Sequence, residues 1–233
     1  AASSAAIAAP TVTAPAVPAW SLLPRPASAR PAGAGAFEVA DGATVAVRGA
    51  DPGQVRSIAM RLMQRLAGVR GLHLRRATAA TAHPAIAFDV NPHADVTGDT
   101  GYRITVDSHG ILVTARTPRG AAGGGVTLWQ LLTPSGWRRG TPAAVAAGVI
   151  DDHPRFAWRA LLLDSGRHFQ SVAEIKKLID WMSLDKLDVL LWHVTEDQGW
   201  RLQIPQYPEL TKTGACRQAV GLDSELTGAA DKP

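Results

Sequence analysis

The sequence of 233 residues predicts an α/β protein with two folded parts. Residues 37–150 combine alternating strand patterns with two amphipathic helix patterns, which is typical of an α+β domain in which two helices pack on a sheet. In residues 151–233, two short apolar runs flank one helix, as in the parallel strands of a βαβ unit. Residues 1–36 are rich in Ala and Pro and lack periodicity, so we expect a tail or linker there.

The composition excludes several classes of protein. Lys and Arg number 24 against 20 Asp and Glu, and these basic residues are scattered, so we expect no nucleic-acid partner. No apolar run approaches the roughly 20 residues of a membrane helix, so we expect no membrane span. The single cysteine, Cys216, excludes a disulfide scaffold and a cysteine-rich metal site.

The first domain begins with a predicted strand over residues 44–48. Asp51 and Pro52 follow as an expected N-cap and first helical residue. The apolar residues of the next segment recur at helical spacing and predict an amphipathic helix that ends near Gly68.

A second group of elements completes this domain. Residues 85–90 predict a strand, and residues 102–106 and 111–115 alternate around a turn, which predicts a hairpin. Thr117 opens a second helix, which stops at Pro134. The glycines of residues 120–125 match neither phosphate-binding spacing, so we interpret them as a close contact between helix and sheet.

The second part follows a polar, proline-containing boundary over residues 151–159. A buried strand is predicted from residue 160, and Ser171 and Glu174 form a capping box at the start of the next helix. Residues 187–192 predict a second buried strand. Polar residues follow both strands at their carboxyl ends, where a (β/α)₈ barrel or a doubly wound sheet builds its active site.

Five of these polar residues are candidates for chemistry. Arg167 lies three residues after Asp164, so its guanidinium could bind two sugar hydroxyls or a carboxylate, or form a structural pair with Asp164. His193, Glu196 and Asp197 lie within five residues of each other and could transfer a proton or hold a polar substrate.

Metal and aromatic sites are the other interpretations of this region. The intervals between His153, His168 and His193 match no metal-binding motif, so we expect neither a metal nor another cofactor. The tryptophans near the strand ends could stack on a sugar face or simply pack in the core or loops; they are Trp158, Trp192 and Trp200.

Three motifs carry a resemblance to a known family. They are D-x-x-R-H-F at 164–169, K-L-D-V-L at 186–190 and W-H-x-x-E-D-Q-G-W-R at 192–201. Together they resemble the start of the catalytic barrel of glycoside hydrolase family 20, the β-N-acetylhexosaminidases. The preceding domain, with T-L-W-Q-L-L at 127–132, is similar to the accessory domain of that family, so the resemblance covers residues 20–233.

The resemblance implies an α+β accessory domain followed by the first βα units of an incomplete TIM barrel. It implies that Arg167 binds the hydroxyls of a terminal N-acetylhexosamine and that Glu196 supports a relay with a histidine on a later loop. Asp164, His193 and Asp197 match positions that shape the rim. Cys216 stands where the family usually has tryptophan, which puts that contact between helix and loop in doubt.

The implied reaction is retaining hydrolysis in which the acetamido oxygen of the substrate is the nucleophile. The family uses an adjacent Asp-Glu pair to polarise that group and to protonate the leaving oxygen. No Asp-Glu dipeptide occurs in this sequence. The resemblance places that pair beyond residue 233, so we expect this chain alone to be inactive.

The length supports the same expectation. Residues 151–233 number 83, whereas a complete barrel needs about 250. The resemblance therefore implies the N-terminal piece of a hexosaminidase that acts on N-acetylhexosamine-containing glycans, including those of chitin degradation. We expect it to be secreted, because an Ala-rich start without Met is what removal of a signal peptide leaves. The alternatives are a non-catalytic carbohydrate-binding or interaction module and another TIM-barrel glycosidase. The sequence leaves open the choice between GlcNAc and GalNAc and the oligomeric state.

Overall fold

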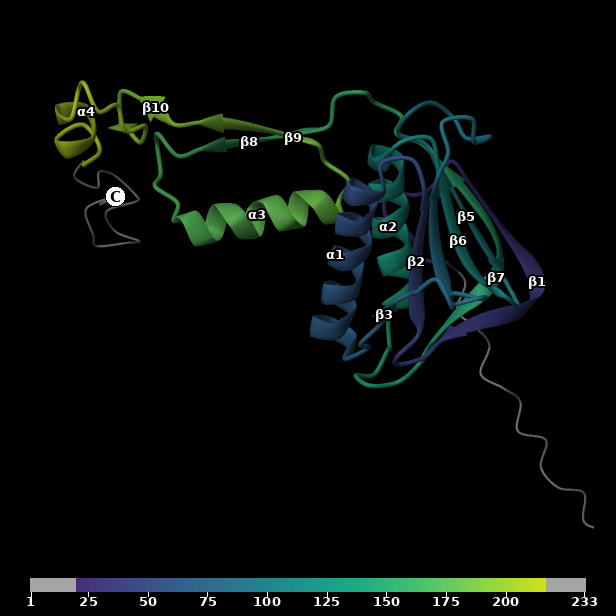
Figure 1. Ribbon diagram of the computed structural model, residues 1–233. Coiled ribbons are helices and arrows are strands. Elements are labelled where there is room, and N and C mark those ends of the chain that lie inside the picture. Colours follow the sequence, from purple (N-terminus) through teal and green to yellow (C-terminus); the bar gives the residue numbers. More distant parts are fainter. Residues whose placement is uncertain (1–19, 217–233) are drawn as a thin grey trace, which may run out of the picture. The chain divides into compact units, whose positions relative to one another are not determined.

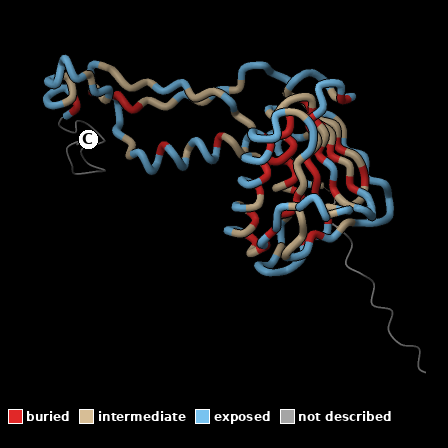
Figure 2. Tube along the Cα trace, in the orientation of Figure 1, coloured by how far each residue is buried: buried red, intermediate tan, exposed pale blue. Residues whose placement is uncertain are grey.

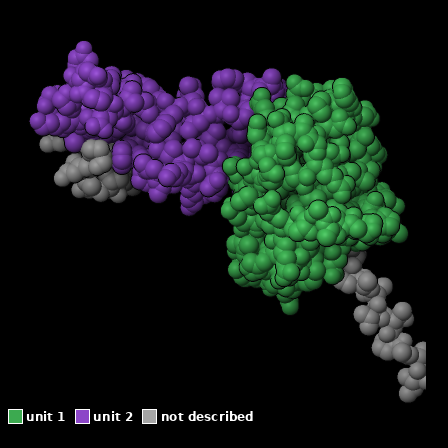
Figure 3. All heavy atoms as spheres, in the orientation of Figure 1, with its two compact units in different colours: residues 1–153 green, residues 154–233 purple. Residues whose placement is uncertain are grey.

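A computed structural model describes residues 20–216 of the chain. The chain divides at residue 153 into two compact units, residues 1–153 and 154–233 (Figure 3). Unit 1 contains β1 (Ser28–Val39), β2 (Thr44–Gly49), α1 (Pro52–Arg70), β3 (Arg75–Arg76), β4 (Ile86–Val90), β5 (Tyr102–Asp107), β6 (Gly110–Ala115), α2 (Pro118–Leu132) and β7 (Ala143–Asp152). Unit 2 contains β8 (Ala160–Asp164), α3 (Val172–Leu184), β9 (Val189–His193), β10 (Thr195–Glu196), β11 (Gly199–Trp200) and α4 (Glu209–Lys212).

The strands of unit 1 form one mixed sheet. It has seven strands in the order β1-β7-β5-β6-β4-β2-β3. The pairs β2–β3, β2–β4 and β4–β6 are parallel, and β5–β6, β5–β7 and β1–β7 are antiparallel. Helices α1 and α2 contact each other and pack on one face of the sheet (Figure 1). Unit 1 is therefore the α+β domain that the sequence predicts.

Strand β1 corrects the predicted tail over residues 28–36. This segment pairs with β7 in antiparallel register, with an irregularity between Pro31 and Ala36. Gly33 and Gly35 have φ values of 86° and 102° there, a backbone that glycine tolerates best. Because β1 is the outermost strand, Pro31 is tolerated at its position in the ladder. The segment forms a strand because it pairs with β7, and the local composition does not predict this pairing.

The start of α1 differs from the predicted cap. Asp51 precedes the helix as expected, but its φ and ψ are 48° and 49° and its side chain caps nothing. A capping side chain needs the extended backbone region, which Asp51 does not occupy. The helix also continues past Gly68 to Arg70, where Gly71, with a φ of 69°, ends it through backbone bonds to Ala67 and Leu66.

The glycines of α2 confirm the predicted close contact between helix and sheet. A Cβ atom built on Gly124 would lie 2.5 Å from Val113 Cγ1, and one on Gly123 would lie 3.1 Å from the Tyr102 ring. Side chains at these positions would push the helix away from β5 and β6. Thr117 caps this helix, accepting a hydrogen bond from the Gly120 amide.

The hydrophobic core of the described residues lies mainly in unit 1, between the two helices and the sheet (Figure 2). In unit 2, Ile175 and Met182 of α3 are buried. The predicted burial of the two strands is wrong for the described residues, because Leu162 of β8 and Leu191 of β9 are 61% and 55% exposed. Among the described residues, none of the helices is both long and apolar enough to cross a membrane.

Unit 2 is built around one βαβ unit. Strands β8 and β9 are parallel, and α3 connects them. The predicted capping box is present, because the Ser171 hydroxyl accepts from the Glu174 amide and the Glu174 carboxylate accepts from the Ser171 amide. The register pairs Asp164 with His193, so the last residues of both strands lie opposite each other.

Candidate active site

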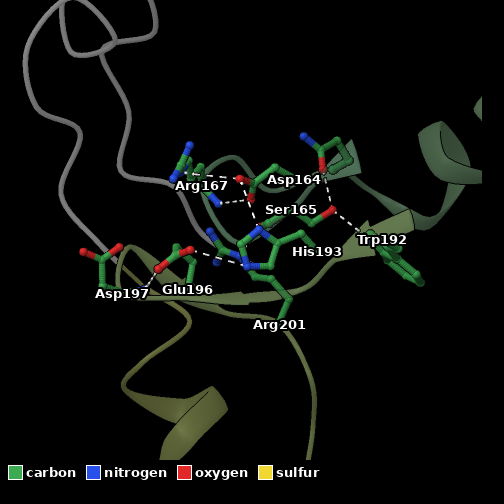
Figure 4. A network of polar contacts seen from close by, with 9 residues as sticks. Asp164, Ser165, Arg167, Trp192, His193, Glu196, Asp197 and Arg201 are labelled. Carbon is green, nitrogen blue, oxygen red and sulfur yellow. Dashed lines mark hydrogen bonds and ion pairs between the residues drawn. The ribbon is translucent and has the colours of Figure 1, made fainter. Parts of the chain in front are cut away.

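The candidate site lies at the carboxyl ends of β8 and β9. Asp164 ends β8 and His193 ends β9, and the parallel register makes them direct neighbours. His193 Nδ1 lies 3.4 Å from Asp164 Oδ2 (Figure 4). The carboxyl ends of parallel strands are where α/β enzymes place their catalytic groups.

Arg167 lies in the loop that follows β8, and Asp164 holds it. The Arg167 backbone amide donates to Asp164 Oδ1 at 3.0 Å, and its Nε lies 3.5 Å from Asp164 Oδ2. The Arg167 side chain is 60% exposed, whereas that of Asp164 is 21% exposed. The structure therefore contains the Arg–Asp pair considered from the sequence, with much of the Arg167 side chain still accessible to a ligand.

Glu196 enters the site from the short hairpin of β10 and β11. Its Oε2 atom lies 3.4 Å from His193 Nε2, and its Oε1 accepts the Asp197 amide at 3.0 Å. Asp197 itself is exposed and contributes this backbone donor. Four of the five candidate side chains thus form one row, in the order Arg167, Asp164, His193 and Glu196.

Gly166 allows the hairpin to approach the β8 loop. A Cβ atom at Gly166 would lie 2.9 Å from Glu196 Cβ and 3.3 Å from the Glu196 amide nitrogen. On the other side, a Cβ at Gly199 would lie 2.7 Å from the Gly166 carbonyl oxygen. The absence of side chains at both glycines therefore allows the loop and the hairpin to lie close together.

Arg201 and Ser165 are structural parts of the site to which sequence reasoning assigned no role. Arg201 Nε donates to the Ser165 carbonyl at 2.8 Å, and its Nη1 donates to the Ala215 carbonyl. The Ser165 hydroxyl donates to Gln170 Oε1 at 2.6 Å. The only signal for Arg201 was its place at the end of the motif at 192–201.

The tryptophans near the site differ in their contacts. Trp192 Nε1 donates to the Ser165 hydroxyl at 2.8 Å, and Trp200 Nε1 donates to the Leu202 carbonyl at 2.6 Å. Trp158 is 68% exposed. The indole N–H groups of Trp192 and Trp200 therefore hydrogen-bond to loop atoms, which favours the packing interpretation for these two residues. Within residues 20–216, no group of three or more His, Cys, Asp or Glu could hold a metal ion.

Both carboxylates of the row are held in the ionised form. The Arg167 amide lowers the pKa of Asp164, and the charges of His193 and Arg167 lower it further. The Asp197 amide lowers the pKa of Glu196, again with help from His193 and Arg167. Hydrogen bonds and cations of this kind favour a carboxylate over the neutral acid.

The lowered pKa of Asp164 predicts a pH-dependent stability. Because the pKa is lower in the folded state than its ordinary value of 3.8, the stabilisation is complete above that value and is lost as the pH falls through the folded-state pKa. We expect Asp164→Asn to lower the melting temperature at pH 6, and this difference from wild type to shrink below about pH 4. Thermal unfolding between pH 6 and pH 3 measures it, and a constant difference would contradict the assignment.

A second prediction concerns the close contact between the β8 loop and the β10–β11 hairpin at Gly166. We expect Gly166→Ala to lower the free energy of unfolding by about 1–3 kcal/mol, because the new methyl group would lie only 2.9 Å from Glu196 Cβ. Denaturant unfolding measures the loss. Gly68→Ala is the control, since its Cβ meets nothing within 4 Å in α1 and should be neutral or stabilising. Equal changes in the free energy of unfolding for the two variants would show that the hairpin does not pack tightly against Gly166.

The family comparisons agree with this geometry. Residues 19–153 match the family described as "Glycosyl hydrolase family 20, domain 2". Residues 156–229 match "Glycosyl hydrolase family 20, catalytic domain". The first match covers unit 1 and the second covers β8, β9 and the candidate site, so unit 2 carries βα units of the barrel of that family.

Curated relatives are named as hexosaminidases. The chain is 42% identical over 118 residues to a "Beta-N-acetylhexosaminidase" of Cellulomonas fimi, a match that covers 51% of this chain and 23% of the relative. It is 40% identical over 122 residues to a "Beta-hexosaminidase" of Porphyromonas gingivalis, covering 51% of this chain and 16% of the relative. The matched region therefore spans about a fifth of the length of these relatives.

Solved structures show the same relationship. A GH20 exo-β-N-acetylglucosaminidase from Vibrio harveyi, in complex with N-acetylglucosamine, superposes with a TM-score of 0.73 at 31% identity over 84% of this chain and 29% of that one. An N-acetyl-β-hexosaminidase from Streptomyces plicatus superposes with a TM-score of 0.72 at 33% identity over 82% of this chain and 38% of that one. From the match of its first unit, its barrel segment and these structures, the chain belongs to glycosyl hydrolase family 20.

Proposed function

We propose that the protein carrying this chain hydrolyses terminal, non-reducing β-linked N-acetylhexosamine residues with retention of configuration. The observation that carries the proposal is Arg167, a partly exposed guanidinium at the end of β8 whose backbone and side chain are both held by Asp164. A guanidinium fixed in this way presents two parallel N–H donors, which suits two neighbouring hydroxyls of one sugar ring.

In this proposal the residues of unit 2 hold the sugar. Arg167 binds ring hydroxyls, Asp164 fixes its direction, and Glu196 supports a relay at the opposite side of the row. The nucleophile is the acetamido oxygen of the substrate. The carboxylates that polarise this group and protonate the leaving oxygen are an adjacent Asp-Glu pair, and the sequence contains no such dipeptide.

The relatives support a substrate class. The Vibrio harveyi structure is described as an exo-β-N-acetylglucosaminidase with N-acetylglucosamine bound. We therefore propose N-acetylglucosamine-containing oligosaccharides, chitin fragments among them, as substrates in carbohydrate metabolism. An extracytoplasmic location stays a prediction, and assays of separated culture medium and cell lysate test it.

The test compares two proteins with chromogenic 4-nitrophenyl N-acetyl-β-glucosaminide and galactosaminide. We expect turnover by a protein that joins this chain to the remaining barrel segments of its family. We expect none by the 233-residue chain alone, because it lacks the Asp-Glu pair. Turnover by the 233-residue chain would contradict the assignment of the reacting carboxylates. Saturable binding of N-acetylglucosamine without turnover by the longer protein would instead indicate a carbohydrate-binding module.

A further inference from the structure

His193 lies between Asp164 and Glu196, and each of its ring nitrogens faces a different one of these carboxylates. Nδ1 lies 3.4 Å from Asp164 Oδ2, and Nε2 lies 3.4 Å from Glu196 Oε2 (Figure 4). The two carboxylates come from different segments, the end of β8 and the β10 hairpin. The imidazole therefore lies between these two segments and faces one carboxylate of each.

The backbone explains why the bridge forms. The register of β8 and β9 places His193 beside Asp164, and the hairpin returns Glu196 three residues later. An ionised carboxylate only accepts hydrogen bonds, and each ring nitrogen of a histidine can donate one when it carries a proton. The side chain of His193 is 38% exposed, which leaves the ring partly covered by the loop and the hairpin.

Each carboxylate also accepts a hydrogen bond from a backbone amide, which fixes the orientation of that carboxylate. Asp164 Oδ1 accepts from the Arg167 amide at 3.0 Å, and Glu196 Oε1 accepts from the Asp197 amide at 3.0 Å. The same histidine contributes to the lowered pKa of both groups. Each carboxylate is thus shared between one local amide and His193.

We propose that His193 is a positioning residue that fixes Glu196 relative to Arg167. Asp164 binds both His193 and Arg167, so a shift of the ring changes the direction of the guanidinium on one side and of Glu196 on the other. This inference rests on the proposed function, in which Arg167 holds the sugar and Glu196 supports the relay. A misplacement of about 1 Å in such a site can cost about 100-fold in rate.

Two variants separate the two contacts of the ring. In His193→Asn, the side-chain amide takes the place of Nδ1 and keeps a donor toward Asp164. In His193→Gln, the longer side chain takes the place of Nε2 and keeps a donor toward Glu196. His193→Ala removes both. The two polar replacements are less disruptive to folding than alanine. The melting temperature of each variant shows whether it folds.

The first readout is structural and uses the 233-residue chain. Backbone amide chemical shifts of Arg167 and Asp197 report on Asp164 and Glu196, respectively, because these amides donate to them. We expect the Asn variant to move chiefly the Asp197 signal, the Gln variant chiefly the Arg167 signal, and the Ala variant both. The Ser171 amide, which donates to Glu174, is the control and should stay unchanged. Unchanged Arg167 and Asp197 signals in the Ala variant would overturn the bridge.

The second readout is kinetic and uses the longer protein with the remaining barrel. We expect His193→Ala to lower kcat/KM by about 10–100-fold. The Asn variant should lower kcat with KM near wild type, since Arg167 stays in place, and the Gln variant should chiefly raise KM. Equal losses in all three variants, or no loss, would overturn the positioning role. An inactive wild-type protein whose amide signals still follow the expected pattern would contradict the proposed function and leave the bridge standing.

Discussion

We expect the replacement of Arg167 by alanine to lower kcat/KM for an N-acetyl-β-glucosaminide by about 1,000-fold in a protein that carries this chain and the rest of the barrel. Two hydrogen bonds from a charged donor contribute about 1.5–3 kcal/mol each, and about 1.4 kcal/mol corresponds to a factor of ten. Arg167→Lys keeps the charge but loses the planar fork, so we expect a loss of about 100-fold. Steady-state kinetics measure both effects.

The control for this prediction is Arg155→Lys, which changes an exposed arginine of the same unit. It should leave kcat/KM within about twofold of the wild-type value, because surface substitutions away from the candidate site have small effects. If Arg167→Lys behaves like Arg155→Lys, Arg167 does not bind the substrate. Its pair with Asp164 is then purely structural, which is the interpretation that its sequence position also allowed.

Arg70→Met has the largest expected effect on the stability of unit 1. Arg70 is 2% exposed at the end of α1. Its guanidinium donates to the carbonyls of Leu132 at 2.6 Å, Thr141 at 3.0 Å and Pro142 at 3.1 Å. Methionine fills similar volume but leaves the buried Leu132 carbonyl unpaired and removes the two partly buried contacts, so we expect a loss of about 3 kcal/mol in the free energy of unfolding.

Arg139→Met is a matched control for Arg70. Arg139 also donates to backbone carbonyls of α1, those of Gly68 and Val69, but from an exposed position. Water can replace those bonds, so we expect a loss below about 1 kcal/mol. Denaturant unfolding of both variants measures the difference. Equal losses would mean that burial does not strengthen the Arg70 contacts.

The fold of unit 2 could be predicted from the sequence because its signals are local. The capping box of Ser171 and Glu174 marks the start of α3, and two continuous apolar runs mark the flanking strands. Parallel pairing of these strands then follows from the crossover connection. The sequence thus predicted polar residues at the carboxyl ends of both strands, whereas the register that pairs Asp164 with His193 comes from the structure.

The missed features depend on contacts between distant segments. Strands β1 and β7 consist largely of small residues, and each becomes a strand by pairing with the other or with β5. Strand propensity depends on such neighbours. His193 and Glu196 are only three residues apart, but the close approach of the Glu196 hairpin to Gly166 of the β8 loop joins distant segments and does not follow from the spacing of residues.

The central claim is that the ends of β8 and β9 hold the sugar through Arg167. A crystal structure of the longer protein with N-acetylglucosamine tests it most directly. We expect both terminal nitrogens of Arg167 to lie within about 3 Å of two neighbouring ring hydroxyls, with Asp164 still bound to the Arg167 amide. A sugar bound elsewhere in the protein, or one that Arg167 does not contact, would contradict it.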